Sequence, residues 1–158
     1  MKMAGKVLLL ILVASTIGCD RATKHLADTS LAGAPPHSYF ADTLRLEYSE
    51  NSGAFLSLGA DLPKRVRTTI FTLGVGLTLS LLALAGLRLH WAGLRLFGAA
   101  LIWAGGTSNL IDRAARGIVV DFINVGVGSL RTGIFNVADL AIVLGFVFIL
   151  IGFRQPTE

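Results

Sequence analysis

The sequence predicts an all-α membrane protein with four transmembrane helices and a small β-containing extramembrane subdomain. Hydrophobic residues make up 53% of the 158 residues and charged residues only 15%, a balance too apolar for an ordinary soluble domain. Four apolar stretches approach the roughly 20 residues that cross a bilayer. A polar connection after the first stretch contains a short alternating pattern typical of a strand. The length allows a single integral membrane domain over residues 1–158.

The first span is predicted over about residues 7–26 and contains the polar island Asp20-Arg21-Ala22-Thr23-Lys24. Asp20 and Lys24 stand four positions apart, so on a helix their side chains share one face and are able to pair. Such a pair is either an exposed helix-end contact of small energetic value or part of a functional site. The sequence leaves both interpretations open.

The same N-terminal segment also resembles a secretory signal, because basic residues precede an apolar run and the segment ends at Thr16-Ile17-Gly18-Cys19. An alternative interpretation is therefore a lipoprotein that is cleaved before Cys19. Thr16 stands where such processing boxes have leucine, and three further spans are unusual in a cleaved lipoprotein. These two features favour an uncleaved first span.

The first connection is predicted to be an extramembrane loop over residues 28–64. Within it, Leu44-Arg45-Leu46-Glu47-Tyr48 alternates apolar and polar residues, which indicates a half-buried strand. A second polar island, Asn51-Ser52-Gly53, follows this strand. The subdomain therefore carries polar candidates close to the membrane surface.

The second and third spans are predicted over about residues 66–87 and 94–111. Residues 88–93 between them are short enough to make an antiparallel hairpin. The third span ends in Thr107-Ser108-Asn109-Leu110-Ile111-Asp112-Arg113, and Asn109, Asp112 and Arg113 share a helix face. Arg113 is expected either to pair with Asp112 and brace the fold or to contact the substrate directly, and Asp112 is the main rival for a place in a catalytic pair.

The third connection, residues 114–133, contains four glycines that break any long helix and should leave Asp121 on a loop or short turn. The fourth span, about residues 134–153, contains Asn136 and Asp139. These two lie three positions apart on one helical face, so the amide of Asn136 is expected to orient the carboxylate of Asp139.

Two aspartates, Asp121 and Asp139, thus occur within apolar runs, where a charge at bilayer depth costs roughly 2.5–3.5 kcal/mol. Acids held at that cost usually face a protein interior or a wet cavity and do chemistry. Hydrolysis of an amide by carboxyl groups alone needs one to activate water and another to polarise the carbonyl. The two acids are therefore predicted to form a catalytic dyad that shares one proton.

Other classes of site lack support in the sequence. The single cysteine, Cys19, excludes an internal disulfide, and the three histidines are not spaced as metal ligands. No cofactor or metal is expected. The net charge of +4 comes without a basic stripe interleaved with aromatic residues, so anionic lipid is a better partner than nucleic acid.

Taken together, the polar islands resemble those of the lipoprotein signal peptidases, or bacterial signal peptidase II, in order, spacing and position over nearly the whole chain. The resemblance implies an intramembrane-type aspartic endopeptidase that removes signal peptides from diacylglyceryl-modified prolipoproteins, cutting before the lipidated cysteine. It implies the bacterial inner membrane, cytoplasmic termini and an active site near the periplasmic face. Prolipoprotein signal peptides, membrane lipid and globomycin-type inhibitors are the partners it implies.

By the same resemblance the catalytic dyad falls on Asp121 and Asp139. Residues implied to line or brace the site come from every polar island: Asp20, Lys24, Asn51, Gly53, Asn109, Asp112, Arg113 and Asn136. The extramembrane loop also offers a clamp across the substrate. Its apolar side chains, Phe55, Leu56 and Leu58, serve that role or pack under their own subdomain.

One residue departs from the family pattern, because Ser108 stands where glycine commonly precedes the asparagine. Its hydroxymethyl group is expected either to narrow the substrate passage or to hydrogen-bond to a carbonyl four residues earlier. Outside the family, a small membrane carrier or proton-relay protein would also place acids and Lys24 at bilayer depth. That second class stays open at this point.

Overall fold

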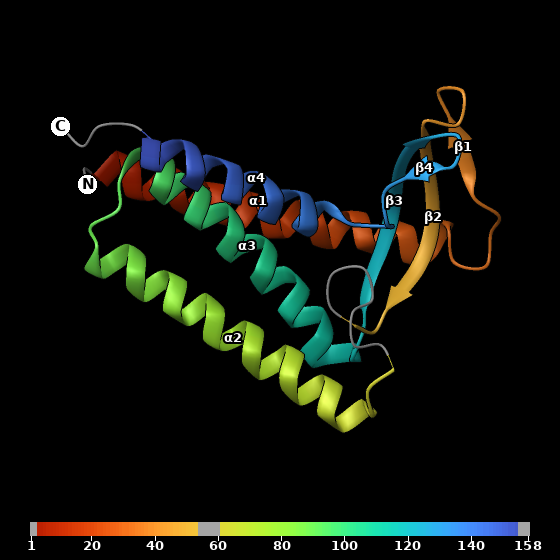
Figure 1. The fold of residues 1–158 in the computed structure, drawn as a ribbon, viewed down its shortest axis with the longest axis horizontal. Coiled ribbons are helices and arrows are strands. Elements are labelled where there is room, and N and C mark those ends of the chain that lie inside the picture. Colours follow the sequence, from red (N-terminus) through yellow and green to blue (C-terminus); the bar gives the residue numbers. More distant parts are fainter. Residues whose placement is uncertain (1–2, 54–60, 155–158) are drawn as a thin grey trace.

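The computed structural model describes residues 3–53 and 61–154, and it consists of long helices with a small antiparallel sheet at one end (Figure 1). This confirms the prediction of a mostly helical protein with a small β-containing part. In chain order the elements are α1 (Met3–Ser30), β1 (His37–Tyr39), β2 (Leu44–Asn51), α2 (Lys64–Arg88), α3 (Gly93–Arg116), β3 (Val119–Val127), β4 (Leu130–Arg131) and α4 (Val137–Arg154).

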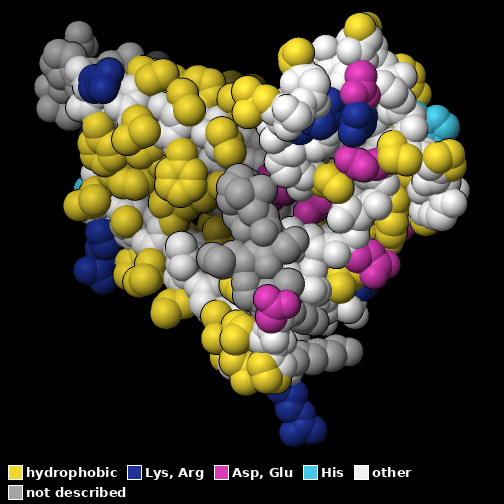
Figure 2. Space-filling model, turned by 45° about the vertical axis from the view of Figure 1, so that its right-hand side comes forward, with side chains coloured by type: hydrophobic (Ala, Val, Ile, Leu, Met, Phe, Trp, Pro, Cys, Tyr) yellow, Lys and Arg dark blue, Asp and Glu magenta, His cyan; other side chains and the backbone are white. Residues whose placement is uncertain are grey.

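Within the described residues, three stretches of helix are long and apolar enough to cross a membrane: Met3–Ser30, Thr69–Arg88 and Val137–Arg154. Large apolar side chains on them are exposed, such as those of Leu8, Leu73 and Leu150. Figure 2 shows hydrophobic side chains crowded over the helical part of one face, whereas acidic and basic side chains gather over the sheet. Apolar exposure of this extent suits a lipid environment.

α3 is not among these three, and its last third carries Asn109, Asp112 and two arginines. It packs against α1, α2 and α4, so that other helices, rather than lipid, cover much of its surface. Its buried residues include Ser108, Asn109 and Asp112. The central helix therefore carries buried polar side chains.

Glycines bring α3 and α4 into close contact. A Cβ atom on Gly145 of α4 would lie 2.6 Å from the carbonyl oxygen of Gly98 on α3, and one on Gly105 would collide with the carbonyl oxygen of Ala138. Small residues at such a crossing let helix backbones approach closely in membranes. These contacts hold the first half of α3 against α4, with Gly105 beside the first turn of α4.

The sheet has the strand order β1-β2-β3-β4, with every pair antiparallel. The half-buried strand predicted from Leu44 is confirmed by β2, and its pairing with β3 shifts register between Leu46 and Ser49. The expectation that Asp121 lies on a loop or short turn is wrong, because Asp121 lies within β3, opposite Ser49.

The physical reason is the position of the glycines in this connection. Gly117 adopts a left-handed conformation just after α3, and Gly128 does so in the β3–β4 turn. Between them stand Val119, Val120 and further β-branched and aromatic residues, which favour extended backbone. The glycines therefore bound a strand instead of preventing one.

β3 is held against α1 by a small apolar cluster of Ala27, Val120 and Phe122, with Tyr48 packed beside it. The sheet thereby lies across one end of the helices. Met3 of α1, Arg154 of α4 and the α2–α3 connection lie at the opposite end (Figure 1).

Candidate active site

Asp121 projects from β3 and is buried, with only 3% of the residue exposed. Two side-chain amides hold its carboxylate: Asn51 donates to Oδ2 at 2.9 Å and Asn136 to Oδ1 at 2.6 Å. Burial raises the pKa of Asp121 to about 6, and the nearby charge of Asp139 adds to the rise, while the two amide donors oppose it. The group is thus poised to carry a proton near neutral pH.

Asn51 is itself fixed where β2 ends. Its Oδ1 accepts the backbone N–H of Gly53 at 3.0 Å, a local turn of the kind that asparagine favours. The amide nitrogen is therefore the end that faces Asp121. The second polar island meets the third connection in this way, although 70 residues separate Asn51 from Asp121 in the sequence.

Asp139 lies in the first turn of α4, and backbone contacts determine its position. Its own N–H donates to Oδ1 of Asn136 at 3.0 Å, and its Oδ2 accepts the N–H of Asn136 at 3.2 Å. This reciprocal pair is a capping box, which satisfies two N–H groups at a helix start. Asn109 of α3 donates to the remaining oxygen, Oδ1, at 2.8 Å.

Asn136 therefore contacts both acids, but not in the way its spacing suggested. Its side-chain amide donates to Asp121, whereas its backbone N–H donates to Asp139. The expectation that the amide orients the carboxylate of Asp139 is wrong in this respect. One residue instead joins the two acids across the gap between β3 and α4.

Both acids line one cavity of about 390 Å³. Asn51, Asn109 and Arg113 share its polar part. The rest of the wall is largely apolar and includes side chains from α2 and α4: Phe71, Val75, Ile142, Val143 and Phe146. The cavity thus combines two carboxyl groups with a surface that suits an apolar chain.

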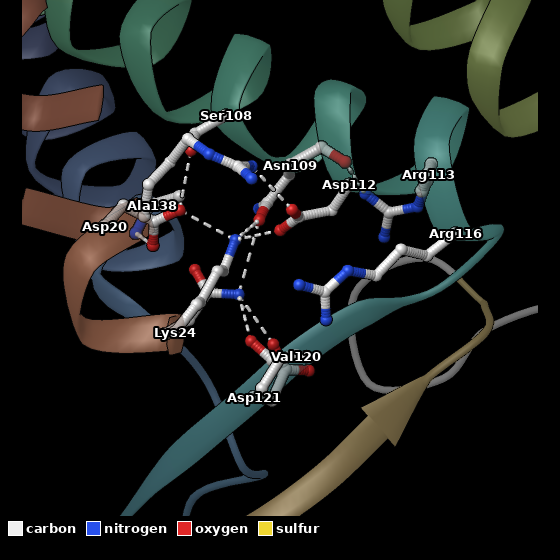
Figure 3. Close-up of polar contacts among 12 residues, drawn as sticks. Asp20, Lys24, Ser108, Asn109, Asp112, Arg113, Arg116, Val120, Asp121 and Ala138 are labelled. Atoms are coloured by element: carbon white, nitrogen blue, oxygen red, sulfur yellow. Dashed lines mark hydrogen bonds and ion pairs between the residues drawn. The ribbon is translucent and has the colours of Figure 1, made fainter. Parts of the chain in front are cut away.

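Beside the cavity lies a buried network of charges (Figure 3). Nζ of Lys24 lies 2.7 Å from each of three oxygens, which belong to Asp20, Asp112 and Asn109. The predicted pairing of Asp20 with Lys24 is confirmed, and both residues are buried, so the interpretation as an exposed helix-end pair is wrong. The neighbouring helix α3 covers them.

Asp112 pairs with Lys24 and with Arg21, the latter at 2.8 Å. The expected pairing of Arg113 with Asp112 is wrong, because the guanidinium of Arg113 donates to the carbonyl oxygen of Gly53 at 2.8 Å and turns toward the cavity. Arg113 thereby ties α3 to the turn that follows β2. Asp112 serves the α1–α3 contact instead.

Ser108 also departs from expectation. Its hydroxyl donates to Oδ2 of Asp20 at 2.7 Å instead of to the carbonyl four residues earlier. The other oxygen of Asp20 accepts the N–H of Ala138 at 2.8 Å, in the first turn of α4. Asp20 therefore joins α1, α3 and α4.

Sequence reasoning missed two groups that the structure brings to this region. Arg21 could have been found from the sequence, because it lies next to Asp20 in the first polar island. The apolar wall residues of the cavity carry no local signal, since their spacing is that of any membrane helix. The residues considered for a clamp, Phe55, Leu56 and Leu58, lie outside the described residues.

Comparison with known proteins gives a consistent result. The family described as signal peptidase (SPase) II matches residues 12–154 of the chain. The lipoprotein signal peptidase of Solibacter usitatus is 31% identical over 142 residues, covering 87% of this chain and 84% of that protein. That of Desulforapulum autotrophicum is 34% identical over 139 residues, covering 83% and 82%.

Two solved structures, both described as bacterial membrane enzymes, share the fold. The first has a TM-score of 0.80 with 22% sequence identity, and the alignment covers 96% of this chain and 93% of that one. The second has a TM-score of 0.77 with 24% identity, covering 95% and 94%.

Proposed function

Because the chain belongs to the signal peptidase II family, and so removes signal peptides from prolipoproteins, we propose that it does so as an aspartic endopeptidase with Asp121 and Asp139 as its catalytic pair. The observation that carries this proposal is the shared cavity: two buried acids from separate elements line it together. Asn136 touches both, which fixes their relative position.

The chemistry follows from two carboxyl groups that share one proton. The ionised carboxylate takes a proton from water as that water attacks the scissile carbonyl carbon, and the protonated partner donates its proton to the carbonyl oxygen. Return of a proton to the amide nitrogen then releases the new amine. Two nearby acids in a buried site do not both ionise cheaply, and the raised pKa of Asp121 fits this sharing.

The substrate proposed is a prolipoprotein whose cysteine already carries a diacylglyceryl group, cut just before that cysteine. A signal peptide is an apolar segment, and its lipid chains are more apolar still. Phe71 and Val75 of α2, with Ile142, Val143 and Phe146 of α4, give the cavity wall the matching character. Binding in this cavity removes apolar surface from water at roughly 25 cal/mol per Å².

For the membrane arrangement we propose four spans, namely the three apolar helices described above and, in addition, α3. We also propose that residues 1–158 form a single domain. Both termini then lie in the cytoplasm and the sheet with the cavity lies at the periplasmic face. Support comes from the shared location of Met3, Arg154 and the α2–α3 connection, opposite the sheet. α3 is long enough at 24 residues, and neighbouring helices bury its polar side chains.

The direct test is cleavage of a synthetic precursor peptide by the purified protein in detergent, with and without the diacylglyceryl group on its cysteine. The proposal expects a single cut before the lipidated cysteine and little or no cut of the unlipidated peptide. Globomycin is expected to block the reaction by occupying the cavity. A protein that binds the precursor yet never cuts it would instead support the carrier class.

A further inference from the structure

The side-chain amide of Asn109 lies between two groups of opposite charge, Lys24 and Asp139. Figure 3 shows its contact with Lys24. Its Oδ1 accepts a hydrogen bond from Nζ of Lys24 at 2.7 Å, and its Nδ2 donates to Oδ1 of Asp139 at 2.8 Å. An amide has one acceptor end and one donor end. Only one of its two orientations satisfies both neighbours, because a half-turn would place the oxygen against the carboxylate and the NH₂ group against the ammonium.

The ammonium that selects this orientation is itself held rigidly. Lys24 donates a hydrogen bond to Asn109 at 2.7 Å and forms ion pairs with Asp20 and Asp112, each also at 2.7 Å. Lys24 is only 4% exposed and Asp20 is fully buried. Ser108 and the N–H of Ala138 hold Asp20 in turn. Burial and these two ion pairs therefore hold the ammonium of Lys24 in place.

We propose that Lys24 is a positioning residue for the reaction. By donating to Oδ1 of Asn109, Lys24 holds the NH₂ group of that amide toward Asp139, and so it acts on Asp139 through Asn109. This inference rests on the proposed function, since it assumes that Asp139 is one of the reacting acids. This role would explain why α1 carries buried charged residues, which packing alone does not require. A neutral apolar side chain would fill the same space at a lower desolvation cost.

Charged groups face Asp139 from three elements packed around it: Lys24 on α1, Arg113 on α3 and Asp121 on β3. α2 contributes the apolar residues Phe71 and Val75 to the same cavity. Removing the ammonium takes away a positive charge and also the 2.7 Å hydrogen bond to Oδ1 of Asn109, so that the longer 3.3 Å bond from Nδ2 of Asn136 holds this amide more weakly. Both effects disfavour an ionised carboxylate in the catalytic pair.

The test compares Lys24→Met with Arg116→Met in the full-length protein. The control removes the cation of another α3 ion pair, in which Arg116 lies 2.7 Å from Asp28 outside the cavity. For Lys24→Met we expect kcat to fall about tenfold or more, as misplacement at a reacting centre does, with KM for the lipidated precursor nearly unchanged. The acidic limb of the pH–rate profile, which belongs to the pair of acids, should move to higher pH. Arg116→Met should change none of these.

A second variant guards against failure to fold, because Lys24→Met leaves the carboxylate of Asp20 buried without its cation. The double variant Lys24→Met with Asp20→Asn removes one charge of each sign, and an asparagine oxygen still accepts the N–H of Ala138. Thermal melting in detergent establishes the folded fraction of each variant. The same fall in kcat and the same shift of the acidic limb are expected in the double variant.

Wild-type kcat and an unmoved pH profile in a folded variant would overturn the positioning role. So would a loss that vanishes when activity is divided by the folded fraction, since that loss reports packing alone. Asp139→Asn is measured alongside. If Asp139→Asn cleaves at the normal rate, the proposed dyad fails and the positioning role fails with it, whereas an inactive Asp139→Asn beside an unaffected Lys24→Met refutes the positioning role only.

Discussion

At the level of single residues, Ser108 shows how one hydroxyl supports a buried charge. Asp20 is fully buried, so its carboxylate needs a partner for each lone-pair direction. Ser108 supplies one hydrogen bond at 2.7 Å, the N–H of Ala138 supplies another, and Lys24 forms an ion pair with the same carboxylate. A glycine at position 108 would remove this hydrogen bond to Asp20.

Ser108→Ala should therefore lower the free energy of unfolding. A hydrogen bond to a charged group contributes about 1.5–3 kcal/mol, and a loss of that size is expected in thermal or denaturant unfolding in detergent. Ser80→Ala is the matched control, because Ser80 donates to the carbonyl oxygen of Gly76 on the exposed face of α2. An equal effect of the two substitutions would show that the bond to Asp20 has no special weight.

Asp121 makes stability depend on pH in a direction that can be worked out. Its pKa is about 6 in the folded protein against an ordinary value of 3.8, so between these values the folded state binds more protons than the unfolded state. The contribution of Asp121 to the free energy of unfolding is therefore greatest below pH 4, falls as pH rises to about 6, and is constant above that. The total decrease is about 3 kcal/mol.

Melting temperatures measured from pH 4 to pH 7 test this dependence. Asp121→Asn does not titrate, so its melting temperature should fall less over this range than that of the unsubstituted protein. Parallel curves for the two proteins would show that the carboxyl of Asp121 titrates at its ordinary value.

At the level of elements, the contact between α3 and α4 sets the distance between Asn109 and Asp139. Gly145 lies where a Cβ atom would come 2.6 Å from both the carbonyl oxygen of Gly98 and the side chain of Ile102. Gly145→Ala should therefore push the helices apart, at a cost of about 1–3 kcal/mol, and reduce kcat because Asp139 moves with α4. Melting in detergent and cleavage kinetics measure the two effects.

Gly74 on α2 provides the control, since a Cβ atom there meets nothing within 4 Å. Gly74→Ala should leave cleavage unchanged and should not lower the melting temperature. If Gly145→Ala behaves in the same way, close packing of α3 on α4 does not position the site.

Hydropathy and alternation were enough to predict the helices and the strand that begins at Leu44, because both patterns are local. β3 was missed, since counting glycines between Ala114 and Gly133 ignored the β-branched run among them. The partners within the buried network were beyond spacing arguments. Ser108 and Asp20 are 88 positions apart and Ala138 and Asp20 are 118 apart, and only the packing of three helices brings them together.

At the level of the whole molecule, the proposed function requires one orientation in the membrane, because the sheet and the cavity are proposed to lie at the periplasmic face. Ser129 lies in the exposed β3–β4 turn and His90 in the exposed α2–α3 connection, at the other end of the helices. In a Cys19→Ser background, Ser129→Cys should react with a membrane-impermeant maleimide in intact spheroplasts. His90→Cys should react only after lysis, and the reverse pattern would invert the proposed orientation.

The central claim is that two acids, Asp121 from the sheet and Asp139 from α4, carry out the cleavage together. Its most direct measurement is the rate at which Asp121→Asn and Asp139→Asn cut the lipidated precursor, with Asp28→Asn as control, since Asp28 pairs with Arg116 outside the cavity. Each variant at the pair should lose cleavage entirely while remaining folded, and Asp28→Asn should retain it. Normal cleavage by either folded variant of the pair would contradict the claim.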